Sequence, residues 1–177
     1  MYLYTKHRQN RNHNMEFGSQ YFIDVVNMKT ITILKALSLG YNVFFSDIDV
    51  LFFENPLPYM DLHVDINIQM ERYNRFKEAN SGFLFAKSNN RTIQLFRNAY
   101  NYYLYRNKRQ QIALNLVLFS GNITGLTVKE LDSYRFPNGR DFFVLENRHF
   151  IEDLPCISYL FEWPFRLFLC DYAQQLD

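Results

Sequence analysis

Cysteine is scarce in this sequence, with Cys156 and Cys170 the only two among 177 residues. Two cysteines cannot build a disulfide framework, and these two lack the paired spacing of a structural zinc site. We expect two buried free thiols, with a single bridge in an oxidising compartment as the alternative. The fold must therefore be held together by an ordinary hydrophobic core.

A surplus of either charge is also missing. The 19 Lys and Arg residues nearly balance the 18 Asp and Glu residues, for a net charge of +1. Nucleic-acid binding usually needs a clearly basic face, so we expect no nucleic-acid partner. No apolar run reaches the length of about 18 residues that a membrane span needs, and no signal peptide opens the chain.

Hydrophobic residues, by contrast, make up 48% of the chain and aromatic residues 18%. This composition is typical of a globular protein rather than a disordered one. Residues 1–15 carry basic side chains and no acid, which predicts an exposed tail. We expect residues 16–177 to form one domain.

The strongest local signal lies within residues 41–60. Two apolar runs, 43–45 and 50–53, flank Ser46-Asp47-Ile48-Asp49. Their unbroken apolar pattern predicts one strand buried on both faces, as in parallel sheets. Alternate residues of a strand point to the same face, so Asp47 and Asp49 should converge on a hard divalent cation. The alternative is a pair of acids that faces water at a strand end.

A helix is expected before this strand, with Ser19 as its N-cap, Leu39 near its end and Gly40 at the C′ position. Lys29 falls in its middle, where a lysine is usually solvated. The residues expected on its buried face are Tyr21, Val25, Met28, Leu34 and Leu37.

Strands and helices are predicted to alternate through the rest of the chain. Alternating polarity over 63–69 predicts a half-exposed strand, and 80–82 is predicted to turn into a buried strand that ends at 86. Helices are expected over 90–107 and 110–119, and strands over 127–131 and 142–145. Gln111 and Asn115 would share one helical face. This alternation predicts one α/β domain.

In this order, the residues resemble the nucleotide-diphospho-sugar transferases, which include plant cell-wall α-xylosyltransferases and arabinosyltransferases. The resemblance covers roughly residues 16–145, and it implies a GT-A-type, Rossmann-like α/β domain with a mostly parallel mixed sheet flanked by helices. The matching pieces are 17–19, Lys29, 39–41, 45–50, Pro56, Asp65, Gln69, 80–83, Gln111, Asn115, 131–132 and 136–139.

The resemblance implies transfer of a sugar, with retention, from a UDP-sugar to a glycan or glycoprotein acceptor. Asp47 and Asp49 would bind Mn²⁺ or another divalent cation, which would hold the diphosphate of the donor. Lys29 would reach the phosphates. The family also implies a type II membrane protein of the Golgi lumen, anchored by a segment that this chain lacks.

Three further positions follow from the resemblance. Asn80 and Gly82 would lie beside the donor sugar, and Gln111 would lie near the anomeric centre, where an amide stabilises charge but is a poor nucleophile.

The chain also departs from the family. Gln110 stands where an acid is common, and a first strand and a late His-x-Asn segment have no counterpart. We therefore expect a chain that is truncated at its N-terminus and transfers sugar poorly, and a non-catalytic relative that keeps the metal and nucleotide site is the second hypothesis. A haloacid-dehalogenase-type phosphatase, with Asp47 as its nucleophile, is the third. Leu51 does not fit that family's pattern.

Overall fold

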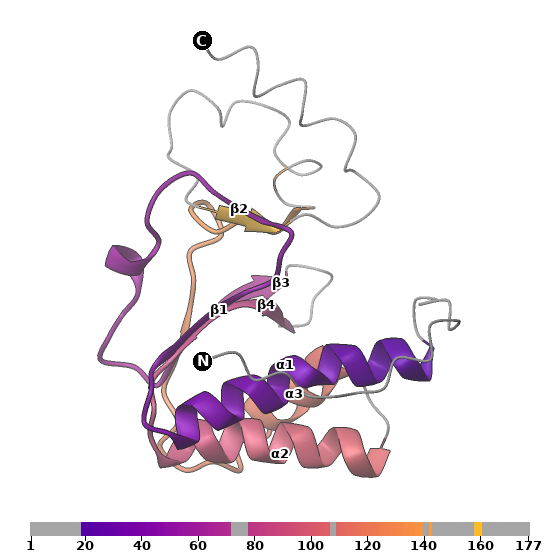
Figure 1. Ribbon diagram of the computed structural model, residues 1–177. Helices are drawn as coiled ribbons and strands as arrows, with labels where there is room; N and C mark the ends of the chain where they lie inside the picture. Colours follow the sequence, from indigo (N-terminus) through magenta and orange to yellow (C-terminus); the bar gives the residue numbers. More distant parts are fainter. Residues whose placement is uncertain (1–18, 72–77, 107–108, 140–141, 143–157, 161–177) are drawn as a thin grey trace.

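The computed structural model describes residues 19–71, 78–106, 109–139, 142 and 158–160. The tail over 1–15, the expected strand residues 143–145 and both cysteines lie outside these ranges. The elements are α1 (Gln20–Ser38), β1 (Val43–Ser46), β2 (Val50–Phe52), the 3₁₀ helix η1 (Leu57–Tyr59), β3 (Ile66–Glu71), β4 (Glu78–Ala86), α2 (Asn90–Arg106), α3 (Gln110–Leu118), β5 (Val128–Glu130) and β6 (Ser158–Leu160) (Figure 1).

The main sheet has four strands in the order β1-β4-β3-β5. β4 runs antiparallel to both of its neighbours, whereas β3 and β5 are parallel. Thus β1, β3 and β5 share one direction, and β4 alone runs against them. Helices α1, α2 and α3 lie together on one side of this sheet (Figure 1). The expectation of an α/β domain with a mixed sheet flanked by helices is confirmed.

β4 separates two hydrophobic clusters, because alternate residues of a strand face opposite sides. Leu84 and Ala86 pack in the cluster beneath the helices, together with Ile33 and Leu37 of α1. Each fully buried side chain of leucine size contributes about 1.5–3 kcal/mol to this core. The cluster on the other face is largely aromatic, and its buried members are Met60, Phe83, Phe85, Leu131 and Phe136.

The predicted ends of α1 are confirmed. Ser19 Oγ accepts a hydrogen bond from the Phe22 N–H at 3.2 Å, which caps the first turn. At the other end Gly40 has a φ of +89°, and its N–H donates to the Leu37 carbonyl while that of Tyr41 donates to the Ala36 carbonyl. These two bonds form a Schellman motif, which explains the glycine at this position.

The predicted buried face of α1 is only partly right. Leu37 is buried, but Tyr21 and Val25 are exposed. The face that packs against the protein instead carries the polar residues Asn27 and Thr30. Asn27 Nδ2 donates a hydrogen bond to the Ile23 carbonyl at 2.7 Å, which lowers the cost of its burial, whereas the buried Thr30 Oγ1 has no partner in the described part of the chain.

The single strand predicted over 43–53 is wrong. The chain forms β1, which pairs with β4, and then β2, which pairs with β6 in a separate small sheet. A turn at Ile48 and Asp49 separates the two strands. The residues of β1 are half-buried rather than fully buried, because β1 lies at one edge of the four-stranded sheet.

The half-exposed strand predicted over 63–69 is also wrong. β3 is buried along its whole length, including its polar residues Asn67 and Gln69. Asn67 forms two hydrogen bonds with the backbone of Asp61, at 2.8 and 2.9 Å, which removes the cost of burying its amide. Residues 80–82, predicted as a turn, lie inside β4.

No helix within the described ranges is long and apolar enough to cross a membrane.

Candidate functional site

The acidic motif lies where the chain passes from the main sheet to the small sheet. Asp47 follows directly after β1, and its N–H donates to the Gly82 carbonyl at 2.8 Å, which ties it to β4. Ile48 is 98% exposed at the tip of the turn, and the half-buried Asp49 leads into β2. The two acids therefore come from a turn and not from one face of a strand. Their convergence on a cation stays a prediction, and the argument from strand alternation is wrong.

Lys29 of α1 reaches this turn. Its Nζ lies 3.1 Å from Asp47 Oδ2 and 3.3 Å from Asp47 Oδ1, so the ammonium contacts both carboxylate oxygens. The side chains are 15% and 34% exposed respectively, and Nζ also lies 5.5 Å from the centre of the Phe45 ring. The expectation from position alone, a solvated lysine, is wrong, because the stem is largely buried and the charge is paired.

Asn80 and Gly82 are joined by their own hydrogen bonds inside β4. The Gly82 N–H donates to Asn80 Oδ1 at 2.7 Å, and Asn80 Nδ2 donates to Glu71 Oε1 at 2.7 Å. Glu71 ends β3, so this chain of bonds links the two central strands. The Asn80 side chain is thus buried and held in one orientation. Glu71 was not predicted, and no local pattern in the sequence connects it with Asn80.

Gln111 and Asn115 of α3 form hydrogen bonds with the first half of β4. Gln111 Oε1 accepts hydrogen bonds from Ser81 N at 3.2 Å and Ser81 Oγ at 3.3 Å, while its Nε2 donates to Glu78 Oε1 at 3.3 Å. Asn115 forms two hydrogen bonds with the backbone of Ala79, at 2.6 and 2.8 Å. The predicted common face of these two residues is confirmed.

Gln110 is the most unusual side chain in this region. It is 2% exposed, and neither atom of its side-chain amide finds a hydrogen-bond partner in the described part of the chain. A buried amide without partners costs about 1–3 kcal/mol. Sequence reasoning marked Gln110 only as a departure from the family, and its burial was not foreseen.

Gln69 positions another matched segment. Its Nε2 donates to the carbonyls of Phe136 and Pro137 at 3.0 and 2.9 Å, which fixes the 136–139 turn against β3. The ring of Phe136 lies 5.5 Å from that of Phe83, the residue that follows Gly82 in β4. The structure thus brings 136–139 to the same sheet that carries Asn80, although the two are far apart in the sequence.

Asp65, another of the residues that match the family, has a structural role. Its carboxylate accepts hydrogen bonds from Arg91, Asn89 and Thr127, and it is nearly fully buried. The Arg91 guanidinium and these further donors hold the pKa of the Asp65 carboxyl well below its usual range. Asp65 precedes β3 and joins it to the starts of α2 and β5, so it takes no part in the acidic turn.

The acidic turn offers ligands of the kind that a hard cation prefers. Among the described residues no group of three or more His, Cys, Asp or Glu side chains comes together to hold a metal. Asp47 and Asp49 would therefore supply only part of a coordination shell, with the rest from a bound ligand and water. In the free chain the ammonium of Lys29 contacts both oxygens of Asp47, so a cation would have to displace it. The donor set fits a shared site for Mn²⁺ or a similar cation.

Two solved structures share this fold. A glycosyltransferase involved in the glycosylation of the major capsid of PBCV-1 superposes with a TM-score of 0.57 at 13% identity, covering 84% of this chain and 73% of that one. An active-site mutant of LgtC superposes with a TM-score of 0.52 at 14% identity, and the match covers 82% of this chain and 66% of the LgtC chain. The chain thus has the α/β fold of the GT-A glycosyltransferases.

The sequence comparisons are more specific. The model of the nucleotide-diphospho-sugar transferase family matches residues 1–154. The chain belongs to this family. Membership agrees with the resemblance seen in the sequence, and it removes the ground for the haloacid-dehalogenase hypothesis.

Three curated relatives match most of the chain. An uncharacterized protein of Arabidopsis thaliana is 38% identical over 125 residues, which are 68% of this chain and 38% of that protein. The β-arabinofuranosyltransferase RAY1 of Arabidopsis thaliana is 34% identical over 144 residues, 70% of this chain and 27% of RAY1. A UDP-galactose:fucoside α-3-galactosyltransferase of Dictyostelium discoideum is 26% identical over 159 residues, which are 73% of this chain and 24% of that protein. The chain therefore spans only about a quarter to two fifths of each relative.

Proposed function

We propose that the chain forms the donor-binding part of a glycosyltransferase, which moves a sugar from a UDP-sugar to a glycan or glycoprotein acceptor with retention. One observation carries the proposal. Hydrogen bonds join Asp47 and Gln111 to one stretch of β4, from Glu78 to Gly82. The same stretch carries Asn80 and Gly82, which are bonded to each other. Family membership and relatives named as arabinosyl- and galactosyltransferases support it.

In this proposal Asp47 and Asp49 hold the divalent cation. When bound, the cation neutralises charge on the departing diphosphate and orients it. Lys29 first balances the charge of Asp47, and then turns its ammonium towards the phosphate oxygens once Asp47 has another positive partner. The buried stem of Lys29 beside Phe45 limits where that ammonium can move.

The amides of β4 and α3 act on the sugar side. Asn80 holds the Gly82 N–H in place through its Oδ1, so the backbone of β4 is fixed at the point where the donor sugar would lie. Gln111 Oε1 carries partial negative charge, and the Ser81 N–H and hydroxyl fix its position, so this oxygen would face the positive charge that develops at the anomeric carbon. An amide dipole fixed before the reaction stabilises such charge without reorganisation.

The proposal includes a location in the secretory pathway, in the Golgi lumen. It is supported by the plant relative that is named as a β-arabinofuranosyltransferase. The 177 residues would then meet nucleotide-sugars and acceptor glycans in the same compartment.

A second candidate function is nucleotide binding without transfer. It is favoured by the engagement of both sugar-side amides, since Asn80 bonds Glu71 and Gln111 bonds Glu78 and Ser81. Gln110 also replaces the acid that is common in the family. Such a relative would bind UDP with the cation but release no UDP from a UDP-sugar.

Ligand-induced stabilisation tests the shared part of both functions. UDP at about 100 times its dissociation constant adds roughly 2.7 kcal/mol to the free energy of unfolding. For a domain of this size the melting temperature rises by roughly 5–10 °C. The rise should need Mn²⁺, vanish with chelator, and vanish in Asp49→Ala but not in the control Asp61→Asn. An equal rise without metal would contradict the proposal.

Turnover then separates the two functions. UDP release from UDP-arabinose, UDP-galactose and UDP-xylose is measured with Mn²⁺, with and without a glycan acceptor. Release that depends on Gln111 supports transfer. Binding without release supports the non-catalytic relative.

A further inference from the structure

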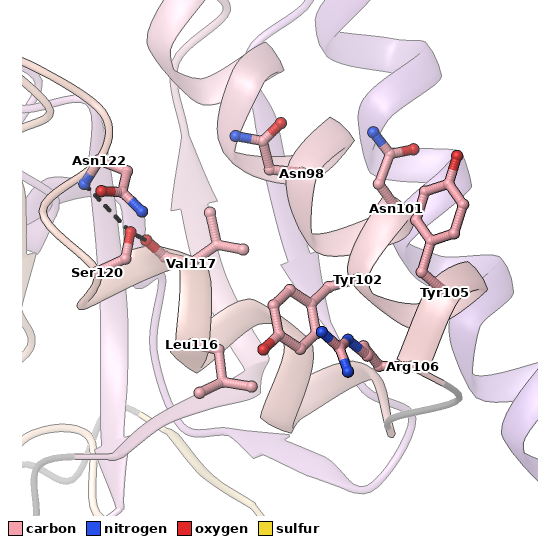
Figure 2. A pocket seen from close by; sticks show the side chains of 9 residues that line it. All are labelled: Asn98, Asn101, Tyr102, Tyr105, Arg106, Leu116, Val117, Ser120 and Asn122. Atoms are coloured by element: carbon pink, nitrogen blue, oxygen red, sulfur yellow. Dashed lines mark hydrogen bonds between the residues drawn. The ribbon is translucent and has the colours of Figure 1, made fainter.

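A pocket of roughly 390 Å³ lies between the second halves of α2 and α3, at the opposite end of α3 from Gln111. None of its residues takes part in the site described above. Figure 2 shows Asn122 and Ser120 at one end of the pocket and Tyr105 and Arg106 at the other, with Tyr102 and Leu116 between them. Its volume falls in the range of about 300–1,000 Å³ that small-molecule sites have.

The lining has the chemistry that recognises a carbohydrate. A pyranose ring has an apolar C–H face and a rim of hydroxyl groups. Tyr102 and Tyr105 offer aromatic faces with a polar end, and Tyr105 is 83% exposed. Asn98, Asn101 and Arg106 add amide and guanidinium groups, which donate to or accept from hydroxyls.

One end of the pocket is itself a glycosylation sequence. Asn122-Ile123-Thr124 matches the acceptor pattern Asn-x-Ser/Thr. Asn122 and Thr124 are exposed, whereas Ile123 is buried in the core beneath the helices and anchors the loop. The backbone N–H of Asn122 donates to Ser120 Oγ at 3.2 Å, which fixes the asparagine beside the pocket (Figure 2).

The other such sequence, Asn90-Arg91-Thr92, is presented differently. It lies in the first turn of α2, and Thr92 is fully buried. The Thr92 hydroxyl donates to the Lys87 carbonyl and accepts from the Asn89 N–H. The threonine of this sequence is therefore occupied in the folded chain, while Thr124 stands in an open loop.

We propose that Asn122 is an N-glycosylation site and that the first sugars of its glycan lie in the pocket against Tyr102 and Leu116. In the modification, Nδ2 of Asn122 loses a proton and bonds to the anomeric carbon of the first sugar. The bond from that carbon to a lipid diphosphate breaks, and the lipid diphosphate leaves with the electron pair. The co-reactant is a lipid-diphosphate-linked oligosaccharide, which the secretory pathway supplies.

This inference goes beyond the proposed sugar transfer and rests only on the proposed location in the secretory pathway. The glycan covers apolar surface on α2 and α3 that is otherwise exposed, since Tyr102 and Leu116 are 37% and 44% exposed. A sugar attached at Asn122 starts at the rim of the pocket and so needs no translational ordering to enter it. A free acceptor glycan is the competing occupant.

The full chain is tested after secretion from plant cells behind a cleavable signal sequence. Peptide mass spectrometry after glycosidase treatment locates each modified asparagine by its conversion to aspartate. Glycosidase release from Asn122 is then timed for the native protein, the denatured protein and native Tyr102→Ala. Asn90→Gln is the matched control, because it removes the other acceptor and leaves the pocket intact.

Glycan should be found on Asn122, and its release from the native chain should be about two- to tenfold slower than from denatured protein or from Tyr102→Ala, as one sugar–aromatic contact would give. Circular dichroism of Tyr102→Ala checks that the helices remain. An unmodified Asn122 overturns the proposal. So does release at equal rates from all three forms, which would leave the pocket to a free glycan.

Discussion

Lys29→Met separates the two roles of the lysine, because it should change metal binding and nucleotide binding in opposite directions. In the free chain the ammonium occupies both oxygens of Asp47 and repels an incoming cation. Methionine keeps the unbranched apolar stem beside Phe45 but removes the charge. The cation alone should therefore bind the variant more tightly.

The size of this gain follows from the exposure of the pair. Exposed ion pairs contribute about 1 kcal/mol or less, and breaking buried pairs costs about 3 kcal/mol or more. With side chains 15% and 34% exposed, Lys29 and Asp47 lie between these cases, at about 1–2 kcal/mol. The dissociation constant of Mn²⁺ alone should fall roughly five- to thirtyfold.

UDP should respond the other way. With Mn²⁺ saturating, the ammonium is free to donate a charge-assisted hydrogen bond to a phosphate oxygen, worth about 1.5–3 kcal/mol. Lys29→Met should therefore weaken UDP binding by roughly ten- to a hundredfold.

Electron paramagnetic resonance of free Mn²⁺ measures the first constant, and calorimetric titration with UDP measures the second. Lys35→Met is the control, since Lys35 is an exposed lysine in the last turn of the same helix. Weaker Mn²⁺ binding by Lys29→Met, or unchanged UDP binding, would refute this account of the lysine.

Three further predictions concern stability. Gln110→Met removes a buried amide without partners in the described structure, so the melting temperature in scanning calorimetry should rise by about 2–4 °C; a fall would show that the amide has a partner. Asp65→Asn should cost about 2 kcal/mol in urea unfolding at pH 7. The pKa of Asp65 in the folded chain lies below its unfolded value of about 3.9. The carboxylate therefore stabilises the fold above about pH 3.9, and this stabilisation is lost as the pH falls further. The Asp65→Asn variant should lack this loss of stability between about pH 5 and 2. Tyr103→Phe removes a 2.6 Å hydrogen bond from the hydroxyl to Asp24, which raises the pKa of Tyr103 to about 12; it should cost about 1 kcal/mol below pH 10, and the difference from the wild type should shrink as the pH rises towards 12. A difference that stays constant up to pH 12 would contradict the assignment.

Features that depend on nearby residues were predictable from the sequence. The ends of α1 follow from Ser19 and Gly40, because a cap acts over three or four residues. The common face of Gln111 and Asn115 follows from helical spacing. The family was recognisable from the order of short pieces, and the fold follows from the family.

Features that depend on distant partners were not predictable. Asn67 and Gln69 look like the solvent face of a strand, yet the backbone of Asp61 satisfies the Asn67 amide, and the carbonyls of Phe136 and Pro137 accept hydrogen bonds from the buried Gln69 Nε2. The apolar run around Asp47 reads as one strand, but its two halves find different partners, β4 and β6. Periodicity reports which face is polar, and it does not report what covers that face.

The ribosome makes these strands in an order that differs from their order in the folded sheet. β1 is made before its partner β4, which follows only after β2 and β3, and Asn115 of α3 forms its hydrogen bonds with Ala79 later still. The turn that carries Asp47 therefore waits for most of the described chain before its bond from Gly82 can form. Pairing between distant segments is slow compared with helix formation. Until then the aromatic residues of β1 and β4 have no partners from the finished sheet, so we expect the chain to be most prone to association while β4 and α3 are being made.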